Sequence, residues 1–119
     1  MSYRKNIILA KIDGRQLLDA LSTATLCLEY YSNHINALNV FPVPDGDTGT
    51  NMLLTMQSVI KETKGNKNSD LSAMSQEISR AALLGARGNS GVILSQFFSG
   101  MAKEFQDHPY CNAALLAKA

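Results

Sequence analysis

Apolar residues recur at intervals of three and four along almost the whole chain, and two glycine-rich segments make the main interruptions. This spacing places apolar side chains on one face of a helix. It predicts helices at about residues 14–38, 50–64, 71–84 and 92–105, with a further helix beginning near Asn112. Segments with the alternating pattern of a strand are nearly absent. The sequence therefore predicts an all-α fold in which four to five helices pack antiparallel.

The composition of the 119 residues fits one small domain. Hydrophobic residues make up 45% and charged residues 18%, which favours a packed core over disorder. The net charge of +1 predicts neither a nucleic-acid partner nor an anionic membrane partner. The aliphatic run at residues 7–10 is too short to cross a bilayer, and the sequence shows no secretory signal. We interpret Cys27 and Cys111 as free thiols and expect a cytoplasmic protein.

The first glycine-rich segment carries two aspartates on either side of a glycine. Carboxylates spaced like Asp45 and Asp47 in a tight turn can reach one cation, and Mg²⁺ commonly takes such carboxylates together with phosphate oxygens and water. Thr48, Gly49 and Asn51 follow at the start of a helix, where free backbone N–H groups favour an anion. The segment is therefore a candidate site for a magnesium nucleotide. A solvated turn that caps the next helix is the alternative.

The second glycine-rich segment, residues 85–91, also leads into a helix. Its three glycines and Ser90 are suited to a phosphate cradle, and Arg87 could neutralise a phosphate or pair with a carboxylate. The lysine of a P-loop is missing, which excludes P-loop folds. The alternative is a plain helical hairpin, in which a glycine ends one helix and a serine begins the next.

Two stretches of the chain resemble the DAK2 (DhaL) domain of the dihydroxyacetone kinase family. They are residues 39–52, Asn-Val-Phe-Pro-Val-Pro-Asp-Gly-Asp-Thr-Gly-Thr-Asn-Met, and residues 85–96, Gly-Ala-Arg-Gly-Asn-Ser-Gly-Val-Ile-Leu-Ser-Gln. Both stand in the family's order, with helices between them. The Phe-Pro-Val-Pro lead-in is closest to the branch that contains the large subunit of bacterial fatty acid kinase. The resemblance implies an N-terminal tail at 1–11 and, at 12–119, about the first half of a barrel of antiparallel helices.

The resemblance also implies roles for residues in both stretches. Asp45 and Asp47 would ligate magnesium at the nucleotide phosphates. A third aspartate of the dihydroxyacetone kinases is absent, because its position holds Val40, and Asn39 is the candidate substitute ligand. The residues near the nucleotide and its phosphates would be those of the turn and of the second loop: Thr48, Asn51, Gly88, Asn89, Ser90 and Gly91.

The family's activity implies a kinase that uses Mg²⁺ and ATP or ADP. The fatty-acid branch implies that a DegV-like partner protein carries a fatty acid as the phosphoryl acceptor. Two alternatives stay open: the nucleotide-binding subunit of a dihydroxyacetone kinase, and a non-catalytic nucleotide-binding regulatory module. The fourth predicted helix is apolar on more than one side, so we also expect a homodimer or a swapped pairing through the third and fourth helices.

Overall fold

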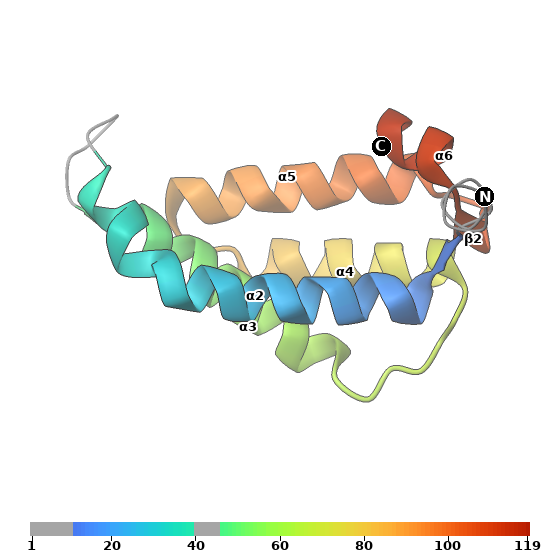
Figure 1. Cartoon of the computed structure of the whole chain (residues 1–119), viewed down its shortest axis with the longest axis horizontal. Coiled ribbons are helices and arrows are strands. Elements are labelled where there is room, and N and C mark those ends of the chain that lie inside the picture. Colours follow the sequence, from blue (N-terminus) through green and yellow to red (C-terminus); the bar gives the residue numbers. More distant parts are fainter. Residues whose placement is uncertain (1–10, 40–45) are drawn as a thin grey trace, which may run out of the picture.

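Helices account for most of the residues that the computed structural model describes, which are 11–39 and 46–119 (Figure 1). The helices are α2 (Gly14–Ala37), α3 (Thr48–Thr63), α4 (Leu71–Gly85), α5 (Gly88–Glu104) and α6 (Ala113–Lys118). Two short strands, β1 (Ile12–Asp13) and β2 (Tyr110–Cys111), pair antiparallel, with Ile12 opposite Cys111. The predicted all-α class is confirmed, whereas the strand pair was not predicted.

Three of the helices begin at a side chain that caps them. In each, the N-cap side chain accepts the backbone N–H of the third helical residue: Asp13 from Gln16 at 2.9 Å, Asp70 from Ala73 at 2.9 Å and Asn112 from Leu115 at 3.0 Å. Such caps satisfy backbone donors that the helix itself leaves without a partner. The polar residues that precede each apolar pattern therefore explain where α2, α4 and α6 start.

Consecutive helices run in opposite directions along the bundle, as Figure 1 shows. The C-terminal ends of α2 and α4 and the N-terminal ends of α3 and α5 consequently lie at one end of the molecule. The strand pair and α6 lie at the other end. α3 and α4 are the central helices, because each contacts the three other long helices. This alternation brings the two glycine-rich segments to the same end of the bundle.

The core forms where α3, α4 and α5 meet, and its largest fully buried apolar side chains are Val59, Leu71, Met74, Ile78 and Phe105. Cys111 of β2 joins this core, and burial raises the pKa of its thiol. Cys27 is exposed on α2, and both cysteines are free thiols, as predicted. Within the described residues, no helix combines the length and apolarity needed to span a membrane.

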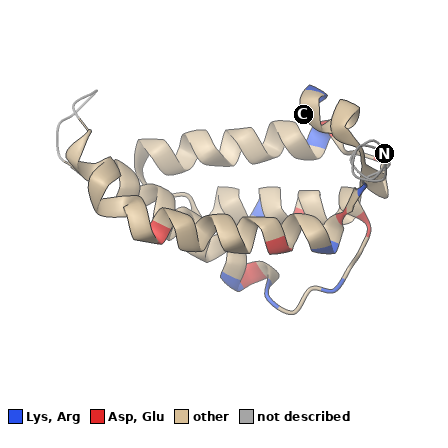
Figure 2. Cartoon of the chain, in the orientation of Figure 1, with Lys and Arg blue, Asp and Glu red and all other residues tan. Residues whose placement is uncertain are grey.

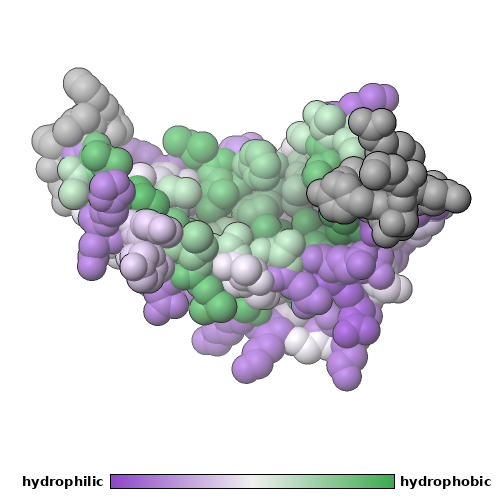
Figure 3. All heavy atoms as spheres, viewed as in Figure 1, coloured by the Kyte–Doolittle hydropathy of each residue, from purple (hydrophilic) through white to green (hydrophobic). Residues whose placement is uncertain are grey.

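An apolar surface is left uncovered on α4 and α5. Phe98 is buried, whereas the adjacent Phe97 is 61% exposed. Four further large apolar side chains of these helices are exposed: Leu83, Leu84, Val92 and Ile93. Figure 3 shows hydrophobic side chains gathered on the face between α2 and α5, and Figure 2 shows that α5 carries little charge before its last turn. The homodimer expected through α4 and α5 remains a prediction, with Phe97 as its most prominent candidate contact.

Replacement of Phe97 by glutamine should weaken self-association. We expect the sedimentation coefficient of the wild type to rise with concentration in the micromolar range, and this rise to shrink in Phe97→Gln, because exposed aromatic side chains dominate many contacts between proteins. Lys103→Gln, on the same helix, is the control that should leave the rise unchanged. A wild type that sediments as a compact monomer at every concentration would contradict the expectation.

Candidate functional site

The two glycine-rich segments meet at one end of the bundle. The Ser90 hydroxyl on α5 donates a hydrogen bond to the Thr48 carbonyl on α3 at 3.1 Å. The Arg87 N–H donates to the Thr55 hydroxyl oxygen, also at 3.1 Å. These bonds join residues that are 42 and 32 positions apart in the chain. The N-termini of α3 and α5 therefore lie side by side, as a single site made from both segments requires.

Two glycines of α5 allow this close approach. Gly88 has a φ of +63° and lies against the Asn51 side chain, so that a Cβ at this position would overlap the Asn51 amide. A Cβ on Gly91 would overlap the Thr55 hydroxyl. Thr55 is fully buried and cannot move aside at low cost. Both glycines consequently hold α5 against α3, in addition to any role near a ligand.

The second segment is a shorter loop than predicted. Only Ala86 and Arg87 separate α4 from α5, and α5 already begins at Gly88. The Gly91 N–H donates to the Arg87 carbonyl at 3.1 Å, so this N–H is not available to a phosphate. The remaining donors at this helix start are the first three residues, whose N–H groups have no carbonyl partner within a helix: Gly88, Asn89 and Ser90. The Arg87 side chain is exposed beside them.

Asp47 is the N-cap residue of α3, yet its side chain makes no capping hydrogen bond. The N–H of the third helical residue, Thr50, instead donates to the Asn36 side-chain oxygen on α2 at 3.0 Å. The predicted alternative of a carboxylate that caps the helix is therefore not formed by Asp47. Asp47 is half-buried, and within the described residues its carboxylate has no hydrogen-bond donor or cation as a partner. A carboxylate oxygen of this kind suits a hard cation such as Mg²⁺.

The end of α2 supports the backbone around Asp47. The Asp47 N–H donates to the Asn39 side-chain oxygen at 3.2 Å, so Asn39 contacts this turn from the α2 side. A Cβ on the buried Gly49 would overlap the Ser32 carbonyl of α2. The role of Asn39 as a metal ligand remains a prediction. Asp45 lies outside the described residues, and in the part of the chain that the structure covers no three acidic, histidine or cysteine side chains converge on one point.

Two residues that matter at this end of the bundle were missed from the sequence. Asn36 accepts from Thr50 across 14 positions, and Thr55 joins α3 to the start of α5. Both lie within helical segments whose local pattern is ordinary. Their partners come from other helices, so the sequence spacing carries no signal of their contacts.

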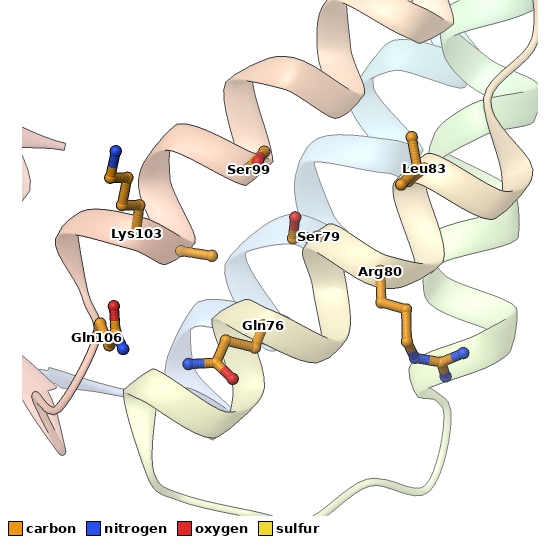
Figure 4. Close-up of a pocket in the computed structure, with 8 residues that line it drawn as sticks. Gln76, Ser79, Arg80, Leu83, Ser99, Lys103 and Gln106 are labelled. Atoms are coloured by element: carbon orange, nitrogen blue, oxygen red, sulfur yellow. The ribbon is translucent and has the colours of Figure 1, made fainter.

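A separate groove of about 530 Å³ opens between α4 and α5 (Figure 4). Polar side chains from both helices and from the residues that follow α5 line it, among them Gln76, Ser79, Ser99, Lys103 and Gln106. Arg80 is paired with Glu77 of its own helix, and the hydrogen bond between them lowers the pKa of the Glu77 carboxyl. None of the residues lining the groove belongs to the two glycine-rich segments. The groove is therefore distinct from the candidate nucleotide site.

Comparison with known proteins supports the resemblance of the chain to the DAK2 family. Residues 42–119 match the family model of the DAK2 domain. The chain is also 41% identical over 112 residues to uncharacterized proteins of Staphylococcus aureus strains USA300 and NCTC 8325, and these matches cover 94% of this chain and 20% of each relative. The chain thus spans only a fifth of the length of these relatives. From the family match, the chain belongs to the DAK2 domain family, the nucleotide-binding module of the dihydroxyacetone-kinase type of kinase.

Proposed function

We propose that this chain is the part of a kinase that binds ATP or ADP together with Mg²⁺. The observation that carries the proposal is the Asp47 carboxylate, which makes no capping bond to α3, beside the adjoining N-termini of α3 and α5. A magnesium nucleotide presents a cation and several anionic oxygens within a few ångströms of one another. One end of this bundle offers a carboxylate for the cation and free N–H groups for the phosphates.

The proposed roles divide between the two segments. Asp47, together with Asp45, which lies outside the described residues, would hold Mg²⁺, with Asn39 as the further candidate ligand. When bound, Mg²⁺ supplies neutralisation of the charge on the phosphate oxygens. The N–H groups at the start of α5 would orient the phosphates, with Arg87 placed to add positive charge. The remaining candidate contacts flank these groups: Thr48, Gly49, Asn51, Gly88, Asn89, Ser90 and Gly91.

The proposed phosphoryl acceptor is a fatty acid carboxylate carried by a DegV-like partner protein. A carboxylate oxygen would attack the γ-phosphorus of ATP, the bond from this phosphorus to the bridging oxygen would break, and an acyl phosphate and ADP would result. Support for this acceptor comes from the Phe-Pro-Val-Pro lead-in, which resembles the fatty-acid branch. If the fatty acid is not phosphorylated, two alternatives remain. The acceptor would be dihydroxyacetone, or the chain would bind the nucleotide without turnover.

Titration calorimetry tests the binding proposal directly. We expect the wild-type chain to bind ADP in the presence of Mg²⁺ and to bind it far more weakly in excess EDTA, because Asp47 would hold the metal and the metal would neutralise the charge of the phosphates. Equal heats with and without Mg²⁺ would contradict the proposed site. ADP release from ATP, measured with a fatty-acid-loaded DegV-like protein or with dihydroxyacetone, then separates the two acceptors. No turnover with either acceptor would favour a regulatory module.

A further inference from the structure

α3 differs from the other capped helices in the residue that caps it. In α2, α4 and α6 the N-cap side chain accepts the N–H of the third helical residue. In α3 this N–H belongs to Thr50, and its acceptor is the Asn36 side-chain oxygen at 3.0 Å, from the end of the preceding helix. The N-cap residue itself, Asp47, makes no capping bond. One helix is thus capped from outside, at the candidate nucleotide site.

The backbone of Asp47 shows the same difference. The side-chain caps Asp13, Asp70 and Asn112 have extended backbone, with ψ values of −177°, 119° and −177°. Asp47 instead has a ψ of 5°. An N-cap residue normally needs an extended conformation to turn its side chain back over the first helical turn. The chain therefore holds Asp47 in a conformation that does not favour self-capping.

Asn36 is fixed in the orientation that external capping requires. Its side-chain nitrogen donates to the Thr50 hydroxyl at 2.9 Å, so both ends of the amide are engaged by the same residue. The backbone carbonyl of Asn36 accepts the Asn39 N–H at 3.1 Å, and the side-chain oxygen of Asn39 accepts the Asp47 N–H at 3.2 Å. Gly49 lets the two helices approach closely enough for these bonds. The two asparagines hold both sides of the turn that carries Asp47.

We propose that Asn36 is a positioning residue that caps α3 in place of Asp47 and so keeps the Asp47 carboxylate available to a metal-bound nucleotide. The inference rests on the proposed function, because Asp47 is taken there as a ligand. A carboxylate oxygen that accepts a backbone N–H is a poorer partner for a cation, and the two uses compete. Without Asn36, the Thr50 N–H would lose its acceptor, and the Asp47 backbone would shift to the extended conformation in which its side chain caps α3, since an N-terminal donor seldom stays unsatisfied.

The first test compares Asn36→Ala with Asn33→Ala, a matched change at an exposed position of the same helix. We expect Asn36→Ala to weaken Mg²⁺–ADP binding by about tenfold. In this variant the Asp47 carboxylate must give up its capping hydrogen bond before it can bind the metal, and the net contribution of one hydrogen bond corresponds to about this factor. Its melting temperature should fall little, since Asp47 replaces the lost cap. Asn33→Ala should change neither quantity. Asn36→Asp keeps an oxygen for the Thr50 N–H, so it should retain most of the binding.

The second test needs no nucleotide. Asp47→Ala should leave the unfolding equilibrium of the otherwise wild-type chain nearly unchanged, because Asn36 supplies the cap. The same change in the Asn36→Ala background should favour unfolding by about tenfold, the typical effect of removing an N-cap. Additive effects of the two changes would overturn external capping. If Asn36→Ala does not fold, the cycle is run with Asn36→Asp, in which Asp47→Ala should again cost little.

The two tests separate the inference from the function on which it rests. If the wild type binds Mg²⁺–ADP and Asn36→Ala binds it equally well, the positioning role is wrong and the proposed function stands. If the wild type does not bind Mg²⁺–ADP, both are overturned. In Asn36→Ala, amide hydrogen exchange at Thr50 should stay close to that of the wild type, because Asp47 then accepts this N–H. Exchange at Thr50 should become faster only when Asp47→Ala is added to Asn36→Ala, and faster exchange in Asn36→Ala alone would contradict the exchange of caps.

Discussion

Asp47→Asn should abolish Mg²⁺-dependent binding of ADP while the helices stay folded. Loss of a direct carboxylate ligand should cost more than about a hundredfold in affinity, since even residues that only support metal ligands cost ten- to a hundredfold. The fold should tolerate the change, because the Asp47 side chain makes no capping bond. Calorimetry with ADP and Mg²⁺, together with circular dichroism, measures both effects. Asp45→Asn should behave in the same way if the two carboxylates share the cation.

Asp70→Asn is the matched control for this experiment. Asp70 is also an N-cap aspartate, but it lies at the opposite end of the bundle and caps α4 through Ala73. Asparagine caps a helix about as well as aspartate, so both stability and binding should be retained. If Asp47→Asn binds Mg²⁺–ADP with the affinity of the wild type, the assignment of Asp47 to the metal is wrong.

Gly91→Ala should destabilise the fold by crowding the contact between α5 and α3. The new Cβ would overlap the hydroxyl of the buried Thr55, which also accepts the Arg87 N–H. Forcing an extra carbon into a packed interface costs about 1–3 kcal/mol. The change should therefore lower the free energy of unfolding and separate the start of α5 from α3. Chemical denaturation measures the loss, and a weaker affinity for Mg²⁺–ADP should accompany it.

Gly100→Ala, on the same helix, should instead raise the free energy of unfolding. Apart from its chain neighbours and the surrounding backbone of α5, no atom lies within 4 Å of a Cβ built at Gly100. Glycine inside a helix costs about 0.5–1 kcal/mol relative to alanine. We therefore expect Gly100→Ala to raise the midpoint of denaturation. Thr55→Ala combined with Gly91→Ala should recover part of the loss, because it removes the overlapping hydroxyl. Equal stabilities of the two single alanine variants would contradict the close contact at Gly91.

The helices could be predicted well from the sequence because their signals are local. Apolar spacing predicted each long helix, and Asp13, Asp70 and Asn112 are caps that act only three residues away. The paired strands could not be predicted. β1 and β2 are two residues each, which is too short for an alternating pattern, and they come from opposite ends of the chain.

The candidate site was predicted in its composition and only partly in its geometry. The sequence placed Gly91 in the loop of the second segment, whereas it lies within α5. A larger residue at this position would overlap α3. Asp47 had the sequence context of an ordinary N-cap. In the structure Asn36 caps α3 in place of Asp47, and only the packing of α2 on α3 brings Asn36 to this position. Contacts between helices of this kind leave no periodic trace in a single sequence.

The alternating directions of the helices also determine the range of the electrostatic field at this end of the bundle. Two helices begin and two end at the same end of the bundle, so about half a positive charge at each N-terminus faces about half a negative charge at each C-terminus. Beyond a Debye length of about 8–10 Å these partial charges cancel, and the net charge of the chain is only +1. A nucleotide in contact with the site would thus find hydrogen-bond donors at the helix N-termini. At a distance it would experience almost no electrostatic attraction. Its association rate should accordingly depend little on ionic strength, in contrast to proteins that steer their ligands.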